Sequence, residues 1–153
     1  IRDEYPDVSC LIIGEGPERS RLLDAIERLG VENNVTVSGF RQSRDRILGV
    51  MKSADVFVLP SQREGFGMTV LESLACGTPV VTIDHPQNAA KELVDDGLTG
   101  VVCDKSPLAI AKGFKRARTC QSADCRSSAH DYDWEYIVNQ IEDVYRSASS
   151  RSV

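Results

Sequence analysis

The sequence predicts an α/β fold, namely a Rossmann-like, three-layer domain with a parallel sheet of about five strands. Two observations carry this prediction. Short apolar runs recur along the chain and end at turns that contain glycine or proline. Amphipathic stretches, with apolar residues three and four positions apart, lie between these runs. Strands that alternate with helices in this way form parallel sheets that helices cover on both faces.

The first part of the chain contains three predicted strands and two predicted helices. In order, they are a strand at Val8–Ile13, a helix at Arg19–Leu29, a strand at Val35–Val37, a helix at Asp45–Ser53 and a strand at Asp55–Leu59. Gly14 ends the first strand, and Pro17 suits the first turn of the helix that follows. Gly30 is a suitable cap for the end of that helix, and Pro60 stops the third strand.

The second part continues the alternation. In order, we expect a helix that starts near Met68, a strand at Val80–Ile83, one or two helical turns at Ala89–Val94, a strand at Gly100–Cys103, a helix at Leu108–Arg118 and an amphipathic helix at Trp134–Arg146. Val70, Leu71, Leu74 and Ala75 form the apolar stripe of the first of these helices, and Gly77 ends it.

Composition excludes several classes of protein. A net charge of -5 does not suggest a nucleic-acid partner, and no apolar run approaches the roughly 20 residues that span a bilayer. Five cysteines without a CxxC pair argue against a disulfide framework and a zinc site, so we expect no metal and a reducing cytoplasm. Cys10, Cys76 and Cys103 lie in apolar segments and are expected to be small core residues. The start without Met, close to a strand, suggests a domain from a longer protein.

The run from residue 64 to residue 82 is the most informative part of the chain. Glu64 precedes a Gly65-Phe66-Gly67 turn, and Glu72 lies inside the helix that follows. Glycines let backbone N–H groups approach a ligand, and a helix N-terminus attracts anions. A carboxylate one turn inside the helix can accept hydrogen bonds from hydroxyl groups. The run therefore suits a ligand that is part phosphate and part sugar.

Three further segments follow predicted strands, at Gly14-Glu15-Gly16, at Gly39-Phe40-Arg41 and at residues 84–88. We expect all of them to share one sheet edge with the central motif, because ligands of such sheets bind at the carboxyl ends of strands. His85 on the last segment could face that ligand. A dinucleotide site at Gly14-x-Gly16 is disfavoured, because Arg19 stands where the third glycine of that fingerprint is needed.

These motifs closely resemble those of the group 1 glycosyl transferases. The resemblance rests on Glu64-Gly65-Phe66-Gly67 followed by Leu71-Glu72-Ser73-Leu74-Ala75-Cys76-Gly77-Thr78-Pro79, which contains the E-x7-E pattern of that family. It extends to Leu11–Pro17, Val35–Phe40, Ser53–Ser61, Glu92–Gly100 and Trp134–Tyr145. The resemblance implies the two-domain GT-B fold and retaining transfer from a nucleotide diphosphate sugar, usually without a bound metal or other cofactor.

The resemblance also implies a role for each matching residue. Glu72 would bind the ribose hydroxyls, and Glu64, as the catalytic residue, would contact the transferred sugar. The amides of Phe66, Gly67, Met68 and Thr69 would face the sugar or the diphosphate, and Gly65 belongs to the same turn. Backbone around Gly39 and Phe40 would meet the base, and Gly14 and Gly16 would line the donor site.

Departures from the family pattern qualify these expectations. By this resemblance, the chain would start after a strand and a helix that carry an Arg and a Lys for the diphosphate, and the acceptor-binding amino-terminal domain would be missing from it. Arg63 or Lys91 could partly replace those two cations electrostatically, although neither matches the family pattern. Gln87-Asn88-Ala89-Ala90 replaces a glycine-rich turn, which puts ligand contacts there in doubt. We therefore expect residues 1–153 to form a donor-binding half that is inactive alone. Two alternative functions stay open, namely a silent nucleotide-sugar-binding module and half of a nucleotide-sugar epimerase. The sequence also leaves open whether the acceptor lies at a membrane surface, and which base and sugar the donor contains.

Overall fold

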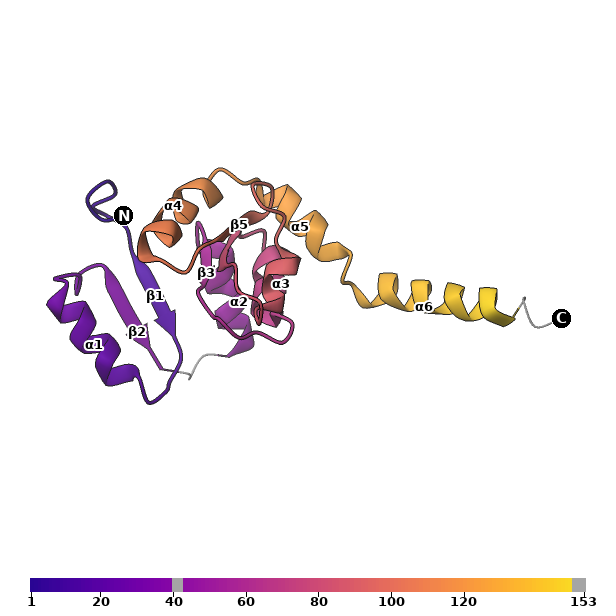
Figure 1. Cartoon of the computed structure of the whole chain (residues 1–153), viewed down its shortest axis with the longest axis horizontal. Coiled ribbons are helices and arrows are strands. Elements are labelled where there is room, and N and C mark those ends of the chain that lie inside the picture. Colours follow the sequence, from indigo (N-terminus) through magenta and orange to yellow (C-terminus); the bar gives the residue numbers. More distant parts are fainter. Residues whose placement is uncertain (40–42, 150–153) are drawn as a thin grey trace. The chain divides into compact units, whose positions relative to one another are not determined.

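A computed structural model describes residues 1–39 and 43–149 (Figure 1). The chain divides into two compact units, Ile1–Arg46 and Ile47–Val153, and the boundary falls inside helix α2 (Arg44–Ser53). Each unit contains strands that pair in parallel, two in the first unit and three in the second. The five predicted strands and their parallel direction are thus confirmed, with hydrogen bonds that group them into two sheets.

The first unit is a β–α–β arrangement. Strand β1 (Cys10–Ile13) pairs with β2 (Val35–Ser38), and helix α1 (Arg19–Arg28) connects them. Gly30 has a φ of 61° directly after this helix, in the left-handed region that favours glycine, which confirms the predicted cap. Ile26 is the buried hydrophobic residue of this unit among those described, so its core is small.

The second unit has a sheet with the order β3-β4-β5, built from Phe57–Leu59, Val80–Ile83 and Gly100–Cys103. The central strand β4 pairs with a neighbour on each side, and all four of its residues are buried. A strand that is covered on both faces reads as a continuous apolar run, which is why Val80–Ile83 could be predicted to the residue.

Helices cover both faces of this sheet, which makes the predicted three layers. Alternate residues of β4 point to opposite faces. Val80 packs with Val70 and Leu74 of helix α3 (Met68–Ala75), with the 3-10 helix η1 (Ala89–Leu93) and with Cys125 of helix α5 (Ser122–His130). Val81 packs with Val101 and with Ala117 of helix α4 (Pro107–Ala117) on the other face.

Helix α6 (Trp134–Ser149) ends the described chain. Its apolar side chains follow one face, as the sequence predicts, yet none of its residues is buried. No helix formed by the described residues combines the length and the apolar content needed to cross a bilayer.

Three details differ from the predictions. Helix α5 was not predicted, because its sequence is mostly polar and only Cys125 is buried. The cysteine assignment was wrong for Cys10, which is exposed, whereas Cys103 is half-buried and packs against the core around Val81, and Cys76 is half-buried. The fully buried thiol is Cys125, whose pKa burial raises to about 11. Ala75 is exposed instead of lying on the buried stripe of α3, because it falls at the last position of that short helix.

Candidate functional site

Glu64 lies on the loop after β3 and is tied by its backbone to the turn after β4. Its N–H donates to the carbonyl oxygen of Gln87 at 3.0 Å, and its own carbonyl oxygen accepts from the N–H of Ala89 at 3.0 Å. Together these bonds form a short parallel bridge between Glu64 and Asn88. The Glu64 side chain is half-buried. The carboxyl ends of β3 and β4 therefore meet at Glu64, as predicted for segments 61–67 and 84–88.

Gly67 joins this loop to helix α3. It has a φ of 95°, and a Cβ atom placed there would collide with Ala90, whose Cα would be only 2.9 Å away. Its carbonyl oxygen accepts from the N–H groups of Val70 and Leu71 at 2.8 and 3.1 Å, which starts the helix. A side chain at position 67 would thus push the Glu64 loop away from the β4 turn, and glycine lets the two meet.

The N-terminus of α3 is open to a ligand. Met68 and Thr69 are exposed, and their N–H groups precede the hydrogen bonds of the helix. The first turn contains no acidic residue, so no carboxylate of that turn offsets the positive end of the helix dipole. Gly65 and Phe66 are exposed too, and the Phe66 ring meets that of Tyr132 edge-on at 6.0 Å.

Glu72 lies in the second turn of α3 and is half-buried. The helix thus holds one carboxylate a turn beyond its N-terminus, and the loop before the helix holds the other, Glu64. Both carboxylates belong to the same unit of the chain and to consecutive elements. The sequence motif is thereby brought to one corner of the sheet.

Asn88 is the group that sequence reasoning missed. It is 1% exposed, and its side-chain Nδ2 donates to the hydroxyl of Thr82 at 3.0 Å and to the carbonyl oxygen of Ile83 at 2.8 Å. The Thr82 hydroxyl in turn donates to the carbonyl oxygen of Leu59 in β3 at 3.0 Å. Asn88 therefore fixes the turn against both strands. The only signal in the sequence was an asparagine close behind an apolar strand, which is also common in ordinary turns.

The structure shows where the residues of Gln87-Asn88-Ala89-Ala90 point. The bulkier residues put ligand contacts at this turn in doubt, and two of them, Asn88 and Ala90, are buried and face the protein interior. Among the described residues, the Oδ1 atom of Asn88 is a buried oxygen without a hydrogen-bond partner.

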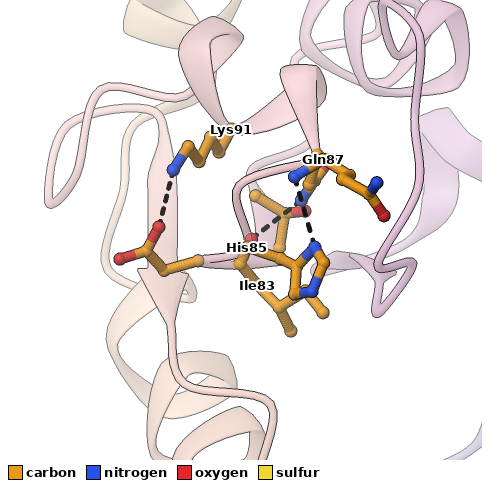
Figure 2. A network of polar contacts seen from close by, with 7 residues as sticks. Ile83, His85, Gln87 and Lys91 are labelled. Atoms are coloured by element: carbon orange, nitrogen blue, oxygen red, sulfur yellow. Dashed lines mark hydrogen bonds and ion pairs between the residues drawn. The ribbon is translucent and has the colours of Figure 1, made fainter.

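Charged and polar groups line the same turn (Figure 2). The Lys91 ammonium is 2.7 Å from a carboxylate oxygen of Asp84. The hydrogen bond from Lys91 holds the pKa of Asp84 below its ordinary value, and the same bond raises the pKa of Lys91. The Nδ1 atom of His85 accepts from the backbone N–H of Gln87 at 3.2 Å.

Within the first unit, the turns that contain the glycines predicted to line the site lie close to each other. The N–H of Gly14 donates to the carbonyl oxygen of Ser38 at 3.0 Å, and a Cβ at Gly39 would lie 2.6 Å from a carboxylate oxygen of Glu15. Gly16 follows in the same exposed turn. Phe40, the other predicted base contact, lies outside the described residues.

Two other features that can mark a functional site are a metal cluster and a cavity elsewhere in the second unit. The described part of the chain has no group of three His, Cys, Asp or Glu residues that could hold a metal ion. A cavity of about 320 Å³ lies at the opposite, amino ends of β3 and β4, where Asp55, Gly77 and Arg126 contribute to its lining. It contains none of the predicted site residues.

Comparison with known proteins gives the family. The family model of glycosyl transferases group 1 matches residues 1–136. An uncharacterised glycosyltransferase of Methanocaldococcus jannaschii is 35% identical over 151 residues, which is 95% of this chain and 35% of that protein. A GDP-mannose-dependent phosphatidylinositol dimannoside mannosyltransferase of Mycobacterium tuberculosis is 39% identical over 113 residues, 74% of this chain and 28% of that protein.

Solved structures agree with the sequence relatives. An Anabaena protein crystallised in complex with UDP and glucose superposes with a TM-score of 0.70 and 27% identity, over 92% of this chain and 41% of that one. The chain thus spans between 28% and 41% of the length of these relatives. With its Rossmann-like α/β fold and GT-B structural neighbours, the chain belongs to the glycosyl transferases group 1.

Proposed function

We propose that this chain is the donor-binding half of a retaining glycosyltransferase that uses a nucleotide diphosphate sugar. The arrangement that most supports it is the bridge between Glu64 and Asn88, together with the contact between Gly67 and Ala90. These contacts hold a carboxylate, a glycine turn and an open helix N-terminus at the carboxyl ends of parallel strands, where such folds bind ligands.

Each group has a role in this proposal. The amides of Phe66, Gly67, Met68 and Thr69 and the α3 dipole stabilise the diphosphate, whose negative charge grows as the bond to the sugar breaks. Glu72 accepts hydrogen bonds from the ribose hydroxyls, and Glu64 contacts the transferred sugar. Gly14, Gly16, Gly39 and Phe40 line the nucleotide side. No cofactor is needed, and the acceptor binds to a separate amino-terminal domain.

The proposal includes two expectations for the isolated chain. It binds the donor but transfers no sugar, because it supplies only the donor half. It works in the cytoplasm, since its five cysteines are free thiols and a reducing compartment keeps thiols in that state.

Calorimetric titration with UDP, UDP-glucose, GDP and GDP-mannose tests the proposal. We expect Glu72→Gln to weaken both the nucleotide and the nucleotide sugar by about tenfold, as loss of a charged hydrogen bond costs roughly 1.5 kcal/mol or more. Glu64→Gln should weaken only the nucleotide sugar. Glu135→Gln, which removes an exposed glutamate of α6, is the matched control and should change nothing. Equal affinity for all four proteins would contradict the proposal.

A further inference from the structure

His85 is attached to the same turn that Glu64 pairs with. It is the second residue after β4 and is half-buried. Its carbonyl oxygen accepts from the N–H of Asn88 at 3.0 Å, so its backbone is locked to the residue that bridges Glu64. Figure 2 shows the imidazole beside Gln87, at the carboxyl end of the central strand.

One hydrogen bond decides which nitrogen of His85 bears the proton. The backbone N–H of Gln87 points at Nδ1 at 3.2 Å, and a backbone N–H can only donate. Nδ1 must therefore be the unprotonated nitrogen, because a proton there would face another proton. This bond holds the ring in one orientation, with Nδ1 as the acceptor and Nε2 as the nitrogen that can donate.

The Nε2–H group is left without a protein acceptor within residues 1–39 and 43–149. The nearest carboxylate in sequence, Asp84, is engaged by Lys91 at 2.7 Å. An N–H donor with a fixed direction, on the turn that pairs with Glu64, suits a hydroxyl oxygen better than it suits a metal or a cation.

We propose that the Nε2–H of His85 donates a hydrogen bond to a hydroxyl of the transferred sugar, which makes His85 a specificity residue of the donor site. This inference rests on the proposed function. It assigns His85 to the sugar end of the donor, because its turn pairs with Glu64, and not to the nucleotide end.

Two substitutions separate this role from a role in shaping the turn. His85→Asn keeps an acceptor for the Gln87 N–H, since asparagine side chains accept from the N–H two residues on, but it removes the distant donor. His85→Gln places an amide N–H near the former Nε2 but removes the acceptor at the turn. Amide spectra of both variants report whether the turn is retained.

The test is titration of each variant with UDP-glucose, GDP-mannose, UDP and GDP. For the nucleotide sugar that the unmodified chain binds, we expect His85→Asn to weaken binding about tenfold, with unchanged affinity for the nucleoside diphosphate. His85→Gln should recover part of that loss.

Three outcomes would overturn the inference. If His85→Asn binds the nucleotide sugar as the unmodified chain does, the histidine only shapes the turn. If His85→Asn loses the nucleoside diphosphate equally, the residue does not act at the sugar. If the unmodified chain binds no nucleotide sugar, the proposed function fails first and this inference fails with it, which the unmodified titration shows separately.

Discussion

Gly67 has both a backbone conformation and a neighbour that favour glycine. Its φ of 95° lies in the left-handed region, and a Cβ would collide with Ala90. The sequence predicted that this glycine brings backbone close to a ligand. The structure shows that it also brings the backbone close to another part of the protein, which a single sequence does not reveal.

Three glycine-to-alanine substitutions separate the cost of the positive φ from the cost of the collision with Ala90. Gly67→Ala should lower the free energy of unfolding by about 3 kcal/mol, from backbone strain plus the collision. Gly97→Ala, with a φ of 86° and its nearest neighbour 3.9 Å away, should cost only about 1–2 kcal/mol of strain. Gly65 has open space around it, so Gly65→Ala should change the free energy of unfolding by less than about 0.5 kcal/mol. Urea denaturation measures all three, and equal losses would contradict the collision.

Asp84 should titrate below its ordinary value of 3.8, because the Lys91 ammonium donates a hydrogen bond to its carboxylate. A folded-state pKa below the unfolded value means that the pair stabilises the fold above the unfolded pKa. That contribution is lost as the pH falls through the folded pKa. Carbon NMR of the Asp84 carboxyl from about pH 6 to about pH 2 measures it. Lys91→Met should return the pKa toward 3.8, and an unchanged pKa in that variant would show that Lys91 is not the cause.

At the scale of elements, how much could be predicted depended on how each element is buried. Strands β4 and β5 were predicted to the residue, because proline, aspartate or glycine marks their ends and because they are mostly apolar, with Thr82 as the polar residue of β4. Helix α5 escaped prediction, since its contact with the core is made chiefly by the small Cys125. The corner formed by Glu64 and α3 was predictable from the motif. The contribution of Asn88 was not, because it depends on where Thr82 and Ile83 place their acceptors.

Helix α4 offers a test of local capping. The Ser106 hydroxyl accepts from the N–H of Ala109 at 3.2 Å, and Pro107 follows at the first helical position. Ser106→Ala should therefore lower the free energy of unfolding by about 1 kcal/mol. Ser127→Ala, on the exposed side of α5, is the control and should leave it unchanged or slightly raised. Thermal unfolding of both variants measures this difference. Equal stabilities would show that the Ser106 cap does not stabilise the fold.

At the scale of the whole molecule, the two units differ in how much they bury. The described residues of the first unit bury the hydrophobic side chain of Ile26, whereas those of the second bury the clusters around Val80 and Val81. Both units carry predicted ligand contacts. That the contacts predicted in the first unit share one sheet edge with those in the second remains a prediction. The first-unit contacts are the ones proposed for the nucleotide part of the donor.

Hydrogen exchange should report this difference directly. We expect the amides of β4 to exchange most slowly, because that strand is buried and paired on both sides. Amides of β2 should exchange many times faster, because little apolar surface holds the first unit together. Equal protection of β2 and β4 would show that the chain unfolds as one unit.

Backbone amide NMR of this chain, titrated with UDP-glucose and GDP-mannose, tests the central claim most directly. Our account predicts that the amide signals of Gly65–Thr69 and of residues 84–90 move together on binding of one of the two, and that Glu72→Gln reduces the response. Shifts confined to the cavity at the amino ends of β3 and β4, around Gly77 and Arg126, would contradict the assignment of the donor site to Glu64 and α3.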